Sequence, residues 1–368
     1  MIKHVLFPFI GQEIGGSHVS AFALAQSLAE DFGFRCVVIA RKGSLIAQEA
    51  QSLGFGVVGT TERTAGRHSP LYDLARVPAR MALLRSLRPA IVHTNDIGAL
   101  QSWLLPAWLA RMPVVYHHRA LNRRVAPNVA LIRAASHVIA ISDETTRSVD
   151  YLPANRVTTV TDPFANNLAT DRAAARAWLV DELGLPNDAA IIGFVGNFWW
   201  RKRPEFFIEA AAIIARIEPH AAFVIFGRDG ELTAGELEAA ASAAGLSDRL
   251  HLAGFRLPVE RNIAALDLLL MPAMREPFGR TPIEAALLGT PYVATDDAGH
   301  SEIWRRWRGG SLVDKDADAA AFADAAIAVL RRPESVLLSE QERLDVASDV
   351  SPRRHAEHVI DVYRRLGA

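Results

Sequence analysis

The feature that most constrains the fold of this chain is an alternation of short apolar runs with segments of helical periodicity. In the first half, apolar runs lie at 4–9, 36–40, 56–59, 90–94, 113–117 and 137–142, and helical segments at about 17–31, 70–87 and 98–111. Uninterrupted apolar runs are typical of parallel strands that helices cover on both faces. The pattern therefore predicts a doubly wound array, which binds its ligand at the carboxyl ends of its strands.

The same alternation begins again after an irregular segment at 161–171. New apolar runs lie at 190–196, 221–227, 249–254, 266–271 and 291–295, with helical segments at 203–216, 233–244 and 280–288. Two arrays predict two Rossmann-like domains, and the 368 residues suit two domains of about 170–180 residues each. We place an N-terminal domain at 1–168 and a C-terminal domain at 169–351. A linker is expected near 163–172, and a final helix at about 352–366.

Composition excludes several classes of protein. Half of the residues (50%) are hydrophobic and 22% are charged, which is typical of globular chains. The formal net charge of −1 argues against a general nucleic-acid binder. However, residues 1–168 hold 17 Lys and Arg against 11 Asp and Glu, while the remainder holds 23 against 30. This imbalance indicates that the N-terminal half faces an anionic partner.

The single cysteine, Cys36, requires no oxidising compartment, and no apolar run is long enough to span a bilayer. The first residues also lack the pattern of a signal peptide. We therefore expect a cytoplasmic protein that touches a membrane at most from its surface.

The segment EPFGRTPIEAALLGTP, residues 276–291, carries the strongest chemical signal. It predicts a loop that holds Glu276 and a helix that starts near Arg280 and carries Glu284 about one turn in. Backbone N–H groups at such a helix start favour phosphate, and carboxylates accept hydrogen bonds from sugar and ribose hydroxyls. Acidic residues that only complement the helix dipole are the simpler alternative for each Glu alone.

This segment resembles the E-x7-E signature of GT4-type retaining glycosyltransferases, and the likeness is densest from about 190 to 313. The resemblance implies the GT-B fold, an α/β fold in which two Rossmann-like doubly wound domains face each other across a cleft. It also implies that the C-terminal helix packs back on the N-terminal domain. In that family the residue matching Glu276 contacts the donor sugar, and the one matching Glu284 contacts the ribose of the nucleotide. Backbone amides that contact sugar and diphosphate are implied at Phe278, Gly279, Arg280 and Thr281.

A second loop, in GNFWWRKRPEFFIEA (196–210), places three cations where a helix is predicted to begin. Cations at this end of a helix oppose its dipole, so a bound anion would compensate them; a solvated basic loop is the simpler alternative. By the family resemblance Lys202 holds the diphosphate and takes part in catalysis. This chain departs from the family pattern, with Asn197 at the position of an arginine and Arg203 at the position of a glycine. Arg201 is the candidate substitute for the missing arginine.

Two weaker signals also concern the nucleotide-sugar donor. Gly15 and Gly16 precede the first helix, which Ser17 is predicted to cap, but they do not form the G-x-G-x-x-G fingerprint of dinucleotide-dependent enzymes. The family resemblance implies that Gly16 approaches the donor phosphates. It also places Phe255 and Arg256, in the segment 254–257, near the nucleotide base.

Polar side chains end two successive apolar runs of the first half, His93 in VHTND and His117 with His118 in VVYHHRA. Ligands of such sheets bind at these strand ends, although a lone histidine is more often structural. The family resemblance implies that His117 lies near the reacting carbon, with His118 as the alternative. Asn95 and Asp96 are candidates for binding acceptor hydroxyls. No set of residues has the spacing of metal ligands, so we expect neither a metal nor another cofactor.

Together with the family resemblance, which implies retention of the anomeric configuration, these observations predict a metal-independent glycosyltransferase that moves a sugar from a nucleotide diphosphate sugar to an acceptor hydroxyl. Same-face substitution is favoured, because no carboxylate is placed for double displacement. Two alternatives stay open: a sugar-nucleotide epimerase of the same fold, and a non-catalytic protein that binds nucleotide sugars.

The acceptor is expected to be a glycan or a lipid-linked glycan. Arginines alternate with apolar residues in 71–89, at Arg76, Arg80, Arg85 and Arg88, and a second basic group lies at 119–133. A basic, partly apolar surface suits peripheral contact with the anionic inner face of a membrane. In the alternative, Pro78 interrupts this helix, the leucines face the core and the arginines are solvated.

Overall fold

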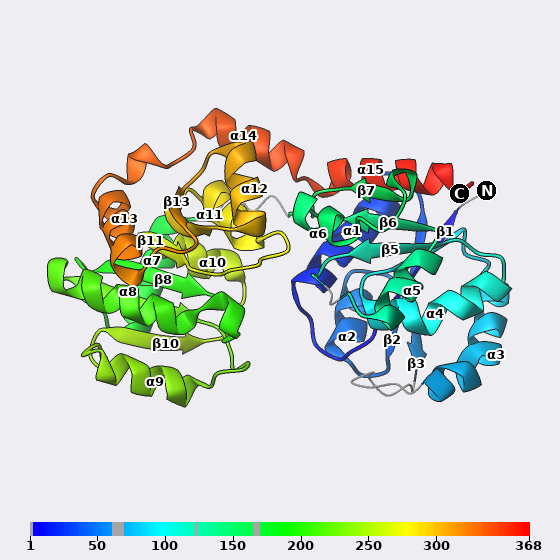
Figure 1. Ribbon diagram of the computed structural model, residues 1–368, viewed down its shortest axis with the longest axis horizontal. Helices are drawn as coiled ribbons and strands as arrows, with labels where there is room; N and C mark the ends of the chain where they lie inside the picture. Colours follow the sequence, from blue (N-terminus) through cyan, green and yellow to red (C-terminus); the bar gives the residue numbers. More distant parts are fainter. Residues whose placement is uncertain (1–2, 61–69, 122–123, 165–169) are drawn as a thin grey trace. The chain divides into compact units, whose positions relative to one another are not determined.

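The computed structural model describes residues 3–60, 70–121, 124–164 and 170–368. The chain divides into two compact units (Figure 1). Unit 1 comprises Met1–Ala165 together with the final segment Asp349–Ala368, and unit 2 comprises Asn166–Ser348.

Unit 1 contains a parallel sheet of seven strands in the order β3-β2-β1-β4-β5-β6-β7. The strands are β1 (His4–Pro8), β2 (Arg35–Arg41), β3 (Gly56–Thr60), β4 (Ile91–Thr94), β5 (Val114–His118), β6 (His137–Ala140) and β7 (Val157–Thr159). The helices are α1 (Gly16–Glu30), α2 (Leu45–Ser52), α3 (Pro70–Leu87), α4 (Ile97–Leu109), α5 (Ala126–Ala134), α6 (Asp143–Ser148) and α15 (Pro352–Arg365), with a 3-10 turn at Ala154–Arg156.

Successive residues of a central strand face opposite cores, which explains why its sequence is an uninterrupted apolar run. Val5 and Phe7 of β1 pack in a cluster that includes Leu24 of α1 and Val359 of α15. Leu6 points to the opposite face, in the cluster formed by residues of α3 and α4. The last helix of the chain, α15, thus lies beside α1 as a full part of unit 1 (Figure 1).

Unit 2 contains a second parallel sheet, of six strands in the order β10-β9-β8-β11-β12-β13. The strands are β8 (Ala190–Val195), β9 (Ala221–Phe226), β10 (Leu250–Gly254), β11 (Leu268–Met271), β12 (Tyr292–Asp296) and β13 (Ser311–Asp314). The helices are α7 (Arg172–Leu183), α8 (Pro204–Ile217), α9 (Ala234–Ala243), α10 (Val259–Ala264), α11 (Arg280–Leu288), α12 (Ala298–Trp307) and α13 (Ala319–Arg331), with 3-10 turns at Trp200–Lys202 and Pro333–Ser335. Helix α14 (Glu340–Asp349) leads into the final segment of unit 1.

The predicted pair of doubly wound α/β domains is confirmed, and every predicted strand begins and ends within two residues of an observed one. The edge strands β7 and β13 were not predicted. Ser17 was expected to cap the first helix, but α1 begins at Gly16 and its N-cap residue is Gly15. Among the described residues, no helix combines the length and the apolar character needed to cross a membrane.

Helix α3 corrects two expectations about its own segment. It continues through Pro78, so the expected interruption of the helix at this proline is wrong. The same alternative expected leucines in the core and solvated arginines, and Leu84 is buried while Arg85 and Arg88 are exposed. The packing of α3 on α4 offsets the hydrogen bond that proline removes. Arg80 was expected on the basic surface but is only 3% exposed, because it pairs with Asp73 at 3.0 Å and donates to the Ser102 carbonyl at 2.7 Å.

Candidate active site

The loop between β11 and α11 holds the buried carboxylate of Glu276, which is 6% exposed. Lys202 Nζ lies 2.8 Å from Glu276 Oε1, and the Arg201 guanidinium pairs with the same oxygen. Burial raises the pKa of Glu276, but the neighbouring Lys202 and Arg201 outweigh it and hold the pKa at about 2. Glu276 is therefore ionised at neutral pH, and this single carboxylate faces two cations.

The sheet topology brings these groups together. Strands β8 and β11 are neighbours, so the loops that follow them meet at one edge of the sheet. The backbone joins the loops as well, since Met274 N donates to Arg201 O at 2.8 Å. Arg203, the third predicted cation, turns away and places its guanidinium 3.8 Å from the centre of the Phe206 ring. The cation pair that meets Glu276 is therefore Arg201 and Lys202.

Helix α11 begins immediately after this loop. Its N-cap is Gly279, whose φ of 87° lies in the left-handed region that side chains disfavour. Phe278, just before it, is buried, and Arg280 and Thr281 form the first turn. Helix starts of this kind attract anions through their backbone N–H groups and the helix dipole.

Glu284 lies one turn into α11, with 17% of its side chain exposed. The Arg280 Nε atom is 3.4 Å from Glu284 Oε1. Burial raises the pKa of Glu284, and the Arg280 guanidinium offsets part of this rise. The pKa values of the two carboxylates in this motif are thus shifted in opposite directions, that of Glu276 downward and that of Glu284 upward.

The start of α12 supports the Glu276 loop, and no pattern in the sequence predicted this contact. Gly299 N donates to Glu276 O at 3.1 Å, and Asp297 Oδ2 accepts from Arg275 N at 2.5 Å. A Cβ atom at Gly299 would lie 2.1 Å from Phe278 O, so only glycine fits there. The only sequence signal that could have identified these residues was their position after β12, which is the neighbour of β11 in the sheet.

His300 is a second residue of this support that was missed. It is 3% exposed and lies against Gly279, where an added Cβ would approach its Cδ2 atom to 2.8 Å. Burial lowers the pKa of His300 to about 4, against the opposing effect of Glu276. His300 is therefore a neutral packing partner of the helix start.

Of the described residues, the remaining ones that were predicted to bind the nucleotide sugar, Arg256, Asn197 and Gly16, form no ion pair with Glu276. Arg256 follows the edge strand β10 and pairs with Glu182 of α7 at 2.9 Å. Asn197 follows β8, and its carbonyl oxygen accepts from Trp199 N at 2.8 Å. Gly16 is the first residue of α1 and belongs to unit 1.

The two candidate histidines of unit 1 are both buried at the carboxyl end of β5. His118 has partners at both ring nitrogens, the Ser148 hydroxyl at 2.7 Å and the Tyr116 hydroxyl at 3.3 Å. Burial lowers the pKa of His118 to about 4. In contrast, His117 Nε2 has no hydrogen-bond partner in the described protein. The geometry therefore favours His117 over His118 as the residue that is available to a ligand.

The neighbouring polar candidates follow β4. Asp96 is the N-cap of α4, and its carboxylate accepts from Ala99 N at 2.7 Å. Burial raises the pKa of Asp96 to about 6, and this hydrogen bond offsets part of the rise. Asn95 is 5% exposed, and its Oδ1 atom lies 3.4 Å from Arg119 Nε. The Asp96 carboxylate is thus already engaged in capping α4, whereas Asn95 shares its partner Arg119 with His117.

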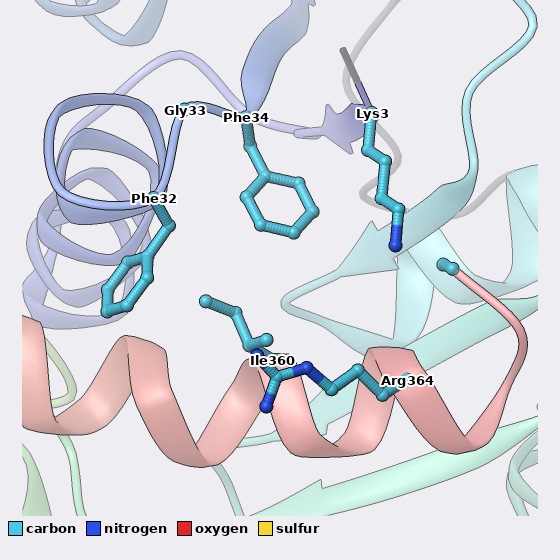
Figure 2. Close-up of a pocket in the computed structure, with 7 residues that line it drawn as sticks. Lys3, Phe32, Gly33, Phe34, Ile360 and Arg364 are labelled. Carbon is cyan, nitrogen blue, oxygen red and sulfur yellow. The ribbon is translucent and has the colours of Figure 1, made fainter. Parts of the chain in front are cut away.

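A separate cavity of about 430 Å³ lies near the amino end of β1 (Figure 2). Lys3, Phe32, Phe34, Ile360 and Arg364 line it. Because His93 and His117 lie at the carboxyl ends of their strands, this cavity is not part of their site. In the described part of the chain, no group of three or more His, Cys, Asp or Glu side chains is arranged to hold a metal ion.

Comparison with known families assigns both units. Residues 14–169 match the family described as Glycosyltransferase Family 4, and residues 189–332 match the one described as Glycosyl transferases group 1. The first match includes Asn95 and His117, and the second includes Glu276 and Glu284. This chain belongs to the GT4-type glycosyltransferases.

Known relatives of this glycosyltransferase differ in function. It is 28% identical to the lipopolysaccharide core biosynthesis mannosyltransferase LpsB of Rhizobium meliloti, over 72% of this chain and 77% of the relative. It is 36% identical to the 2-deoxystreptamine glucosyltransferase of Streptomyces kanamyceticus, over 45% of this chain and 43% of the relative. Among solved structures, Anabaena HepE in complex with UDP and glucose superposes with a TM-score of 0.84 at 20% identity, over 99% of this chain and 100% of that one. The fold predicted for this glycosyltransferase, GT-B, is thereby confirmed.

Proposed function

We propose that this glycosyltransferase transfers a sugar from a nucleoside diphosphate sugar to an acceptor hydroxyl. The observation that carries the proposal is the meeting of the buried Glu276 carboxylate with Lys202 and Arg201 beside the start of α11. Sugar hydroxyls donate to a carboxylate, and a diphosphate is attracted to the remaining positive charge. The HepE structure, which contains UDP and glucose, supports a nucleotide-sugar donor.

Each residue of this site has a proposed role. Lys202, Arg201 and the first amides of α11 stabilise the charge that develops on the leaving diphosphate. Glu276 binds hydroxyls of the donor sugar, and Glu284 binds the ribose. Since side chains already supply positive charge for the diphosphate, the proposed reaction needs no metal ion.

The anomeric configuration is retained in this proposal. The acceptor oxygen forms a bond to the anomeric carbon on the face from which the phosphate oxygen departs, and this departing oxygen takes up the proton of the acceptor hydroxyl. Double displacement would instead need a carboxylate nucleophile close to the anomeric carbon, opposite the leaving group. In unit 1, the capping role of Asp96 makes this carboxylate a poor candidate for a nucleophile.

We further propose a glycan or lipid-linked acceptor and a cytoplasmic enzyme that touches the inner membrane face. The support is a stripe of exposed apolar residues on α4, in which Leu105, Leu109 and the 71% exposed Trp108 are followed by the exposed Arg111. Indole rings and arginines favour the boundary between lipid and water. The role of LpsB in lipopolysaccharide core biosynthesis agrees with such an acceptor.

One experiment separates this proposal from its two alternatives. A thermal-shift panel of nucleotide sugars identifies the donor, because a ligand of the native state raises the melting temperature. The selected donor is then incubated with and without candidate acceptors. A transferase releases nucleoside diphosphate as the acceptor gains sugar. An epimerase interconverts the donor without acceptor, and a binding protein releases nothing; either result would overturn the proposal.

A further inference from the structure

A chain of buried hydrogen bonds leads from the last helix of the protein to His117. The Tyr363 hydroxyl of α15 lies 2.6 Å from His93 Nδ1, and His93 Nε2 lies 3.1 Å from His117 Nδ1. Arg119 Nη2 lies 3.2 Å from the same His117 Nδ1 atom. None of these four side chains is more than about a tenth exposed.

Arg119 sets the direction of every bond in this chain. A guanidinium can only donate, so His117 Nδ1 must accept. A neutral imidazole with an accepting Nδ1 carries its proton on Nε2. Because His117 Nδ1 cannot donate, His93 Nε2 is the donor of their shared hydrogen bond. His93 Nδ1 is then an acceptor, and the Tyr363 hydroxyl donates to it.

The charge state agrees with this assignment. Burial, followed by the positive charge of Arg119, lowers the pKa of His117 well below its ordinary value. Asp162 in turn pairs with Arg119 and holds the guanidinium in place. His117 is therefore a neutral ring with one N–H group.

That N–H group is left for a ligand. His117 Nε2 is buried without a partner in the described protein, and so is Nδ2 of Asn95, whose Oδ1 lies 3.4 Å from Arg119 Nε. Buried polar groups are rarely left unpaired. Two unpaired donors at the carboxyl ends of adjacent strands suit an oxygen atom that the substrate supplies.

The adjacent His355 holds the opposite tautomer. Its ring stacks on that of His117, with centroids 5.5 Å apart and an interplanar angle of 8°. His355 Nδ1 lies 2.7 Å from the Thr161 carbonyl oxygen, which can only accept, so Nδ1 carries the proton. The two stacked rings thus provide an internal comparison for any measurement of proton position.

We propose that His117 donates a hydrogen bond through Nε2 to an oxygen of the bound substrate and does not remove the proton of the acceptor hydroxyl. Arg119, His93 and Tyr363 are its positioning residues. This inference rests on the proposed sugar transfer, because the oxygen belongs to a substrate of that reaction.

The proton positions are tested in the whole protein without any activity. Long-range proton–nitrogen correlation spectra of the protein with nitrogen-15 histidine distinguish the two neutral tautomers, and His117→Gln and His355→Gln variants assign the signals. The expected result is an Nε2–H tautomer for His117 and an Nδ1–H tautomer for His355. An Nδ1–H tautomer for His117 would overturn the inference.

The turnover of His117 variants then tests the role of the Nε2–H group as a hydrogen-bond donor. The Gln side chain of His117→Gln offers an amide N–H near the position of Nε2, whereas His117→Ala offers none. We expect His117→Ala to lower kcat at least about tenfold and His117→Gln to recover most of this loss. If His117 were the base, both variants would lose about 10²–10⁴-fold. That outcome overturns the inference.

Tyr363→Phe tests positioning, since it removes only the hydroxyl. Its His93 Nδ1 signal should shift because this nitrogen loses its hydrogen-bond donor, while the Nε2–H tautomer stays. Its kcat should fall severalfold, and its affinity for the nucleoside diphosphate should stay that of wild type. An unchanged His93 signal and an unchanged kcat would remove Tyr363 from the proposal. If wild-type protein transfers no sugar, the proposed function fails, and the spectra still decide where the proton of His117 lies.

Discussion

Lys202 Nζ lies 2.8 Å from Glu276 Oε1, which joins the loop after β8 to the loop after β11. The buried carboxylate would be costly alone, and the two cations would repel each other without it. The ion pair therefore holds the two loops in place before any ligand binds. It also gives the site its charge, because Arg201 adds a second cation to the same carboxylate.

The first prediction concerns acid stability. The pKa of Glu276 is held at about 2, below its ordinary 4.5, so its contribution to stability is complete above the ordinary value and is lost as the pH falls toward 2. The difference in free energy of unfolding between wild type and Glu276→Gln should shrink by roughly 2 kcal/mol between pH 5 and pH 2.5. Urea unfolding followed at several pH values measures it, with Glu238→Gln on the exposed face of α9 as the control. A difference that is independent of pH would contradict the prediction.

The second prediction concerns the ribose. Glu284→Ala should weaken binding of the nucleoside diphosphate by about 1.5–3 kcal/mol, because the ribose hydroxyls lose a charged acceptor. Glu276→Ala should reduce turnover more than it reduces this affinity. Calorimetry with the diphosphate alone provides the measurement, and Glu238→Ala is the matched control. Equal affinity in wild type and Glu284→Ala would remove Glu284 from the ribose site.

The third prediction concerns metal ions. Transfer should continue after dialysis against EDTA, because Lys202 and Arg201 supply the positive charge that a metal would supply elsewhere. The initial rate is measured before dialysis, after it, and after magnesium or manganese is added back. A rate that is lost with EDTA and restored by either ion would show that side chains do not suffice to stabilise the leaving group.

The fourth prediction compares two arginines of α3. Arg80→Met should destabilise the protein by about 3–5 kcal/mol, because it leaves the buried Asp73 carboxylate without its cation. Arg85→Met, at an exposed position of the same helix, should change stability by less than about 0.5 kcal/mol. Thermal unfolding of both variants tests this contrast. Similar effects of the two substitutions would mean that the ion pair between Arg80 and Asp73 contributes no measurable stability.

The difference between these arginines shows what the sequence could and could not predict. Val5 and Phe7 of β1 face one hydrophobic core and Leu6 faces the core on the other side of the sheet, so a local apolar run was enough to predict this strand. Glu276 and Glu284 were found because their motif is contiguous. Arg80 looked solvated among its leucines because its burial depends on a helix packed against it.

Contacts between distant segments account for the functional residues that were missed. Tyr363 reaches His93 across 270 positions of the sequence, and no local pattern links them. His300 reaches Gly279 only because β11 and β12 are neighbours in the sheet. If the order of the strands had been known, His300 could have been placed near the segment 276–291. Its burial against Gly279 would still not have been predicted, because it depends on side-chain packing.

The last prediction concerns the membrane. If the stripe on α4 rests on lipid, the protein should sediment with anionic vesicles, sediment less with neutral ones, and dissociate as salt rises. Trp108→Ser should reduce the bound fraction, since it removes the most exposed side chain of this stripe. Arg111→Ser should lower the partition coefficient about fivefold, the equivalent of about 1 kcal/mol for each cation near the surface.

Arg85 and Arg88 of the same unit are suitable for a further double variant, whereas Arg80 is not, because it is buried. Leu344→Ser, at an exposed apolar position of unit 2, is the control and should bind like wild type. Equal and negligible sedimentation with both kinds of vesicle would exclude this surface from membrane contact and favour a soluble acceptor.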